Sequence, residues 1–194
     1  MTYSISPVRT VAPSETPVSR TEAKAHLRVT GTTEDTLIDG LIAAAVAHVD
    51  GWSGILGRCV VTQTWRQDVD DFSDCVALPF PDVQSVTVTY YDAANAVQTL
   101  SGSTYNLVNR TSGTFLELAD GASWPVVYSR PDAVKISMVC GYGAAAAVPV
   151  AIKQAMLVLI GHWYSNREAV SEAAMSEVPL AVGALLAPYR RIGL

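Results

Sequence analysis

The longest helical pattern in the chain lies between Val148 and Glu168. Its apolar residues recur at spacings of three and four, which places them on one face of a helix: Ile152, Met156, Leu159, Ile160 and Trp163. Pro149 suits the first helical turn, because proline has no N–H group to leave unpaired there. Most of the opposite side is also apolar, and such a helix is buried on several sides. We therefore predict a core helix, in which Gly161 allows another backbone to approach closely.

Two shorter helical patterns precede this one. The first begins with Ser19 and Glu22, which have the spacing of a capping box. The second carries an apolar stripe at helical spacing, formed by Leu37, Ile38, Leu41, Ile42, Ala45 and Val49. Thr32 and Asp35 offer another capping box at its start. Both segments are predicted to be helices, near residues 19–29 and 33–51.

The middle of the chain changes to short alternating stretches rich in Val, Thr and Tyr, separated by turn residues. This pattern is typical of antiparallel strands. We expect strands at residues 60–69, 75–78, 85–91, 97–100, 105–108, 114–118 and 133–140. The chain is therefore predicted to have an α+β fold: a helical core with helices near 19–29, 33–51 and 148–166 and a short C-terminal helix, and an antiparallel β-rich insertion at about 59–141.

The two ends of the chain have a different character from this central domain, which we place at residues 18–168. Residues 1–17 hold three prolines among Ser and Thr without an apolar period, so they are predicted to be an extended arm. Such arms are usually disordered alone and order on a partner. Residues 169–194 are predicted to be a flexible linker of small residues followed by a C-terminal docking segment.

Composition narrows the class of protein. The 194 residues suffice for one domain with a sizeable core plus arms, and part of the 49% hydrophobic content is expected to serve subunit contacts. The formal charge is −5 without any Lys/Arg-rich run, so the electrostatic footprint of a nucleic-acid binder is missing. No signal peptide is found, and Lys153 and His162 interrupt the longest apolar stretch too early for a membrane span.

The three cysteines, Cys59, Cys75 and Cys140, are widely spaced and odd in number. This spacing argues against a disulfide framework and against a zinc site. We predict that all three are reduced, buried and structural.

Candidate catalytic groups lack the spacing that catalysis or metal binding requires. His26, His48 and His162 fall on three different predicted helices without a ligand motif. No nucleophile elbow, phosphate-binding loop or complete dinucleotide-binding glycine motif is present. The sequence thus predicts no catalytic, cofactor-binding or metal-binding residues, and no enzymatic activity.

Two further groups of residues have structural interpretations. Asp70, Asp71 and Asp74 lack the register of a calcium-binding loop and are predicted to lie in a solvated turn. Trp65, Trp124 and Trp163 could be ligand platforms, but large aromatics in so apolar a chain are more often core residues.

The C-terminal segment is the best candidate for binding a partner. It combines apolar residues with an aromatic residue and two arginines, and Arg and Tyr are enriched at interface hot spots. It is too short to build its own core, so it gains most from docking into a preformed groove, and its removal is expected to leave the domain nearly as stable. A solvated tail is the alternative. The candidate partner-binding residues are Leu180, Leu185, Leu186, Tyr189, Arg190 and Arg191.

An ordered series of short segments carries a family resemblance. No single segment is specific for the family, but the order of the segments along residues 17–191 is specific. The segments are Pro17–Val29, Glu34–Ile38, Gln63–Trp65, Leu78–Pro79, Gly141–Pro149, His162–Glu168 and Leu185–Arg190. Together they resemble the head–tail connector (adaptor) proteins of long-tailed bacteriophages and of phage-derived gene transfer agents. The arm before Pro17 is not placed by the resemblance.

The resemblance implies a virion or gene transfer agent component made in the bacterial host cytoplasm. In this family, identical subunits form a ring, expected to be dodecameric, beneath the portal at the head–tail junction. The C-terminal segment docks on the portal protein, and the other face receives the next tail-side connector or terminator. DNA passes through the lumen without sequence-specific binding, and no cofactor, membrane or catalysis is involved. A net charge of −5 on each subunit suits a conduit that repels phosphate.

Two other classes of function remain open at this stage. The chain could be a small hydrolase-like enzyme, because a site assembled in space leaves no sequence motif. It could also be a β-rich module that binds a ligand through exposed Trp or Tyr residues.

Overall fold

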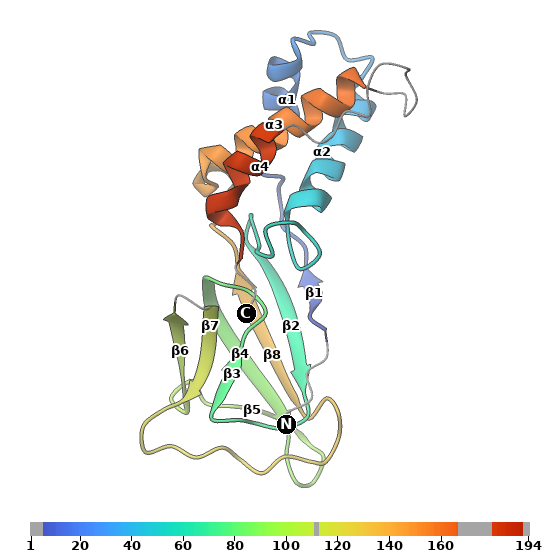
Figure 1. The fold of residues 1–194 in the computed structure, drawn as a ribbon. Coiled ribbons are helices and arrows are strands. Elements are labelled where there is room, and N and C mark those ends of the chain that lie inside the picture. The colour runs from blue at the N-terminus through green and yellow to red at the C-terminus, as the bar shows by residue number, and fades with distance from the viewer. Residues whose placement is uncertain (1–5, 111–112, 167–179, 192–194) are drawn as a thin grey trace. The chain divides into compact units, whose positions relative to one another are not determined.

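The computed structural model describes residues 6–110, 113–166 and 180–191, and the chain divides into two compact units (Figure 1). Of the described residues, the helical unit contains those within 15–61 and 142–191, and the β unit contains those within 6–14 and 62–141. The strands of residues 62–141 lie between the second and third helices in the sequence, so they form an insertion within the helical unit. The predicted α+β class with a β-rich insertion is confirmed.

Four helices lie in the described residues of the helical unit. They are α1 (Arg20–Leu27), α2 (Asp35–Val49), α3 (Val150–Ser165) and α4 (Leu180–Leu186), with short 3-10 turns η1 (Ala145–Ala147) and η2 (Ala187–Tyr189). All four lie where the hydrophobic pattern predicts helix. Within the described residues, no helix is both long enough and apolar enough to span a bilayer.

The predicted capping box at the start of α1 is confirmed. The Ser19 backbone N–H donates to Glu22 Oε2 at 2.7 Å, and the Glu22 N–H donates to Ser19 Oγ at 3.2 Å. The hydrogen bonds to its carboxylate lower the pKa of Glu22. The second predicted box, between Thr32 and Asp35, is wrong. Asp35 instead accepts a 2.6 Å bond from Lys24 Nζ, so an ion pair between α1 and α2 takes the carboxylate that would have capped α2.

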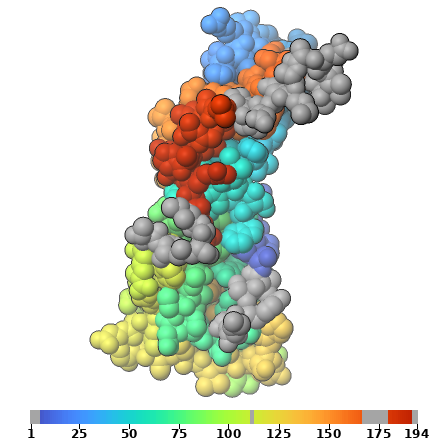
Figure 2. Space-filling model, in the orientation of Figure 1, coloured from blue at the N-terminus to red at the C-terminus, as the bar shows by residue number. Residues whose placement is uncertain are grey.

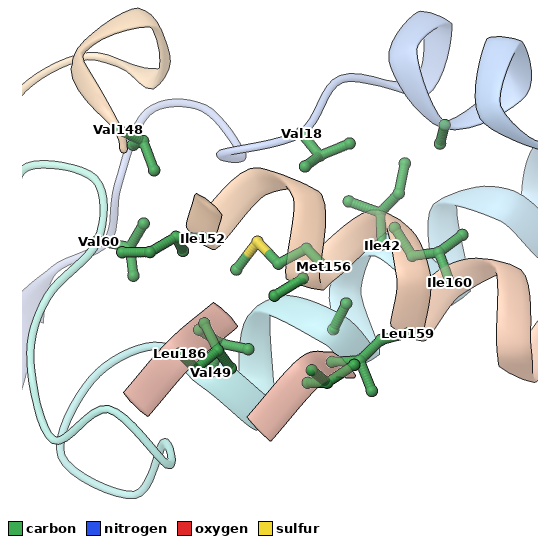
Figure 3. Close-up of a cluster of buried hydrophobic side chains, with 14 of the residues drawn as sticks. Val18, Ile42, Val49, Val60, Val148, Ile152, Met156, Leu159, Ile160 and Leu186 are labelled. Atoms are coloured by element: carbon green, nitrogen blue, oxygen red, sulfur yellow. The ribbon is translucent and has the colours of Figure 1, made fainter. Parts of the chain in front are cut away.

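The core of the helical unit is built around α3 (Figure 3). Ile152, Met156, Leu159 and Ile160 have no solvent exposure, as the helical spacing predicts. They pack with residues of the other helices and of the adjoining loops in one apolar cluster, to which Ile42, Val49, Val60, Val148 and Leu186 also belong.

Two details of α3 differ from the prediction. Trp163 is only partly buried at the edge of the core, with its ring 6.2 Å from that of His48 in an edge-on arrangement. It lies at the end of the helix, where fewer elements cover it than cover Met156. Gly161 accommodates the side chain of His26 rather than another backbone, since a Cβ atom at Gly161 would lie 3.2 Å from His26 Nε2.

The β unit contains two antiparallel sheets. The first has five strands in the order β1-β2-β8-β4-β5 and the second has three in the order β3-β7-β6. The strands are β1 (Val8–Val11), β2 (Gln63–Val69), β3 (Cys75–Ala77), β4 (Val83–Tyr91), β5 (Val97–Thr99), β6 (Tyr105–Arg110), β7 (Gly113–Leu118) and β8 (Val134–Cys140). Strands β2 to β8 agree with the predicted segments.

The central strand β8 shows how the alternating pattern builds the larger sheet. Val134, Ile136, Met138 and Cys140 have no exposure, whereas the residues between them are partly exposed. Successive side chains of a strand point to opposite faces, so one face of this sheet forms the core of the β unit and the other faces solvent.

The N-terminal arm departs from expectation, because part of it belongs to the β unit. Val8–Val11 forms the edge strand β1, which pairs with β2 opposite Thr64, Trp65 and Arg66. All four of its residues are exposed, so it has no apolar pattern from which a strand could be predicted. Backbone hydrogen bonds, which any sequence can form, hold it in place.

Candidate docking surface

The C-terminal segment packs against the helical unit itself. Helix α4 lies along α3 at the surface of this unit (Figure 2). Val182 and Leu186 are 1% and 0% exposed and belong to the core cluster. The expectation that this segment lacks a groove in its own subunit is therefore wrong for α4, and we expect α4 to contribute to the stability of the helical unit. Val182 and Leu186 are four residues apart, so they lie on the same face of α4 and pack together in the core cluster.

The six predicted docking residues consequently have different environments. Leu186 is buried, and Leu185 and Tyr189 are partly buried against the core. Leu180 is 89% exposed and Arg190 is also exposed, while Arg191 is partly exposed. Only part of the predicted set is thus accessible to another protein. The predicted linker, residues 169–178, lies outside the described residues.

A glycine-rich loop after α2 receives the C-terminal residues. The loop turns at Gly51 and Gly57, which have φ values of 79° and 60°, where glycine is favoured. Asp50 Oδ1 accepts a 2.6 Å bond from the Val60 N–H, and the Gly51 N–H donates to the Arg58 carbonyl at 2.9 Å. These bonds close the loop on itself, so it presents fixed carbonyl groups to the segment that follows α4.

Arg190 and Arg191 are anchored to this loop through backbone groups. The Arg191 N–H donates to the Leu56 carbonyl at 2.8 Å, and Arg190 Nε donates to the Ile55 carbonyl at 3.3 Å. A Cβ atom at Gly57 would lie 3.3 Å from Arg191 Cβ, so the small residue there leaves space for the arginine. The two arginines are therefore held at defined positions.

Aromatic rings contact two arginines at this loop, Arg191 and Arg58. The Arg191 guanidinium carbon lies 5.9 Å from the centre of the Trp52 ring, and that of Arg58 lies 5.8 Å from the Tyr142 ring. Arg58 Nη1 also donates to the Tyr142 hydroxyl at 2.7 Å. We call these five residues the arginine cluster: Trp52, Arg58, Tyr142, Arg190 and Arg191.

Sequence analysis located only the C-terminal part of this surface. Trp52 and Arg58 were not singled out, because no local pattern connects them to residues more than 130 positions away. The one available signal was the closely spaced glycines at 51, 54 and 57, which indicate a tightly folded loop.

The histidines do not form a ligand set in the described residues. His26 and His162 line one shallow hollow with Leu27, Val158, Gly161 and Tyr164, although sequence analysis treated them as unrelated. His48 instead contacts Trp163. Across the described ranges, no three His, Cys, Asp or Glu side chains gather as a metal site would require.

The acidic turn and the two tryptophans Trp65 and Trp124 belong to the β unit. Asp71 and Asp74 lie in an exposed turn between β2 and β3, as predicted. The ring of Phe72 in that turn stacks on Trp124, with the centres 4.6 Å apart and the planes 2° from parallel. Trp65 is partly buried, with its ring 5.0 Å from that of Phe80. These contacts are packing interactions within the β unit.

The shifted pKa values have structural causes. The hydrogen bond from Arg20 lowers the pKa of Asp39, and the hydrogen bond from Arg130 lowers the pKa of Asp132. Burial raises the pKa of Tyr105, whose hydroxyl donates to the Val86 carbonyl at 3.0 Å. These groups belong to ion pairs and to packed interfaces between elements rather than to one convergent site.

The cysteines agree with the prediction in part. All three are free thiols, and Cys59 and Cys140 are buried, but Cys75 is exposed. Cys75 lies on the short strand β3, whose alternation buries only Val76. Its sulfur lies 3.4 Å from Glu117 Oε1. Partial desolvation, with a smaller effect of Glu117, raises the pKa of this thiol.

We expect a thiol reagent to label only Cys75 in the folded protein, and all three cysteines in denaturant. Because the thiolate is the nucleophile, the raised pKa should make Cys75 react more slowly than free cysteine at mildly alkaline pH. Absorbance titration with a disulfide reagent measures both the number and the rate. Cys75→Ser should abolish labelling of the folded protein, and rapid labelling of a second site would contradict the burial of Cys59 and Cys140.

Chains of similar fold occur in solved structures of gene transfer agent particles. No protein-family model and no curated protein matches the chain. A chain in the structure described as the neck of an empty GTA particle, computed with C6 symmetry, is similar with a TM-score of 0.78 and 25% identity. A chain in the virion of a native gene transfer agent particle has a TM-score of 0.75 and 23% identity. A chain in the neck of a native GTA particle, computed with C12 symmetry, has 0.71 and 20%.

Each comparison covers 98% of this chain and 97% of the other. The likeness therefore includes both the helical unit and the β unit. The sequence resemblance to connector proteins of gene transfer agents is confirmed at the level of the whole fold.

Proposed function

We propose that this chain is a structural connector in the neck of a gene transfer agent or phage particle, at the head–tail junction. The observation that carries the proposal is the likeness to a neck protein over 98% of the chain, with a TM-score of 0.78 and 25% identity. Its neighbours are structural parts of particles, which favours a structural role over the hydrolase-like and ligand-binding alternatives.

The chain acts as one subunit of a homo-oligomeric ring in this proposal. Neck structures computed with C6 and C12 symmetry support a ring, and we propose that it is dodecameric. A cyclic ring uses two different faces of each subunit, so each copy must present apolar surface that is exposed in isolation. Val126, Val150 and Leu180 are 76%, 80% and 89% exposed, which is consistent with such contacts.

The ring lies beneath the portal, and the C-terminal surface of the helical unit docks on the portal protein. Leu180, Tyr189 and Arg190 are the accessible residues of the predicted docking set, whereas Leu186 supports them from the core. The other face of the ring receives the next tail-side connector or terminator. DNA passes through the lumen, where a net charge of −5 on each subunit disfavours tight contact with phosphate.

Deletion of the gene in the producing bacterium tests this function. We expect DNA-filled heads that lack tails, and we expect the full-length chain to restore tailed particles when supplied in trans. Electron microscopy of purified particles measures the fraction with tails. Normal tailed particles from the deletion strain would refute the connector role, whereas heads without DNA would indicate a role in packaging instead.

A further inference from the structure

We propose that the arginine cluster recognises carboxylate groups on an acidic segment of the protein that the C-terminal surface binds. The proposal rests on the connector function and specifies the chemistry of its head-side contact. It extends the docking surface from the C-terminal segment to the loop after α2, which contributes Trp52 and Arg58.

The first argument is the way in which the chain uses its other cations. Seven Lys and Arg residues form ion pairs with acidic residues of the same chain: Arg20, Lys24, Arg66, Arg110, Arg130, Lys135 and Lys153. Within the described part of the chain, Arg190 forms no ion pair, which is also true of Arg9 and Arg28. Of these three arginines, only Arg190 is held in place by a side-chain hydrogen bond. Its Nε is bonded to the Ile55 carbonyl, and its two Nη groups can still receive a carboxylate in the bidentate geometry that arginine favours.

The second argument is that the cluster is already ordered for binding. The backbone bond from Arg191 to Leu56 and the bond from Arg190 Nε to Ile55 fix the positions of both arginines relative to the loop. Arg191 lies against the Trp52 ring, which is 44% exposed. Side chains held in place before binding lose less conformational freedom on binding. Tryptophan, tyrosine and arginine are also the residues most enriched at interface hot spots.

The third argument concerns the class of partner. A surface that grips DNA carries Lys and Arg in a stripe along the phosphate backbone, and it belongs to a basic domain. This chain has 13 basic and 18 acidic residues. Two adjacent arginines held against one loop, with Arg191 beside the Trp52 ring, fit a short acidic protein segment better than a duplex. The subunit carries a net negative charge, so the arginine cluster is a local positive region to which an acidic segment would be attracted.

The test uses the purified full-length chain and tail-less heads from the deletion strain. Heads are sedimented with the wild-type chain or with Arg190→Glu, and the bound chain is quantified. We expect the charge reversal to weaken binding by about tenfold or more, and Arg190→Lys to weaken it less, since lysine keeps the charge but loses the bidentate geometry. Raising NaCl from roughly 50 to 500 mM should weaken wild-type binding.

The matched control is Arg28→Glu, which makes the same charge change at another exposed arginine of the helical unit. It should bind heads as the wild type does, and thermal melts of all variants should agree because both positions are exposed. If Arg190→Glu is unfolded, Arg190→Lys decides the question through its loss of binding. Equal binding by wild type, Arg190→Glu and Arg190→Lys would overturn the arginine contact while leaving the connector function intact.

Two other results would overturn the proposed function or the class of partner. If the wild-type chain does not bind heads at all, the proposed function fails, and this inference fails with it. If the wild-type chain binds a fluorescein-labelled duplex of about 20 base pairs at moderate salt, and Arg190→Glu does not, the cluster contacts DNA rather than an acidic protein segment.

Discussion

Replacing Leu186 with alanine is expected to destabilise the helical unit by about 2–5 kcal/mol, the usual range for removing a buried leucine side chain. Leu186 has no solvent exposure and lies in the same cluster as Val49 and Leu159. Its removal would leave a cavity where α4 meets the core. Chemical denaturation of the purified chain, followed by circular dichroism, measures the change in the free energy of unfolding.

Leu180→Ala is the matched control, because it deletes the same atoms from the same helix. Leu180 is 89% exposed, so this variant should lie within about 0.5 kcal/mol of the wild type. If both variants had wild-type stability, α4 would not be part of the core, and the C-terminal segment would again be free to dock elsewhere. By the same reasoning, deletion of residues 179–194 should destabilise the helical unit strongly.

The second large effect is expected at Gly54, where alanine should destabilise the chain by about 1–3 kcal/mol or more. A Cβ atom there would lie 2.4 Å from the Asp50 carbonyl oxygen and 2.5 Å from two backbone atoms of Val49. Backbone atoms cannot turn aside as a flexible side chain can, so the loop itself must shift. That shift would also move the carbonyl groups that hold Arg190 and Arg191. Thermal unfolding measures the loss of stability.

Gly40→Ala is the control for this second prediction. Gly40 lies within α2, and a Cβ atom there meets nothing within 4 Å. Alanine should therefore stabilise the helix by about 0.5–1 kcal/mol, because glycine loses more conformational freedom on folding. A destabilised Gly40→Ala, or a Gly54→Ala as stable as the wild type, would show that the two glycines are not distinguished by their surroundings.

The features that were predictable from sequence are those set by neighbours in the chain. The Ser19–Glu22 capping box depends on residues three apart, and the buried face of α3 depends on a period of about 3.6 residues. The burial of alternate residues in β8 follows from the two-residue repeat of a strand. In each case, the residues that decide the structure lie within one element.

The features that could not be predicted depend on distant partners. Asp35 could cap α2 by its position, but Lys24 and Arg20 of another helix bind its carboxylate instead. The strand β1 has only exposed side chains, so nothing in its sequence distinguishes it from a free arm. The alternating pattern predicts the strands but not their division into two sheets, because strand order is decided by pairing between distant residues.

The docking surface illustrates the same limit. The arginines at 190 and 191 could be identified as candidates from their residue types, because Arg and Tyr are common at interfaces. Their position beside the loop at 51–58 could not be predicted, since the backbone hydrogen bond from Arg191 to Leu56 joins residues 135 positions apart. The burial of α4 could not be predicted either, because it depends on packing against α3 and against distant residues such as Val49.

The order in which the chain is made gives the split helical unit a particular vulnerability. Helix α2 ends at Val49, whereas α3, which covers its apolar stripe, begins at Val150. At typical translation rates, the stripe waits on the order of 5–20 s for its partner, and the strands of residues 62–141 leave the ribosome in that interval. Until α3 has been made, Ile38, Ile42 and Val49 therefore lack the helix that buries them in the finished core.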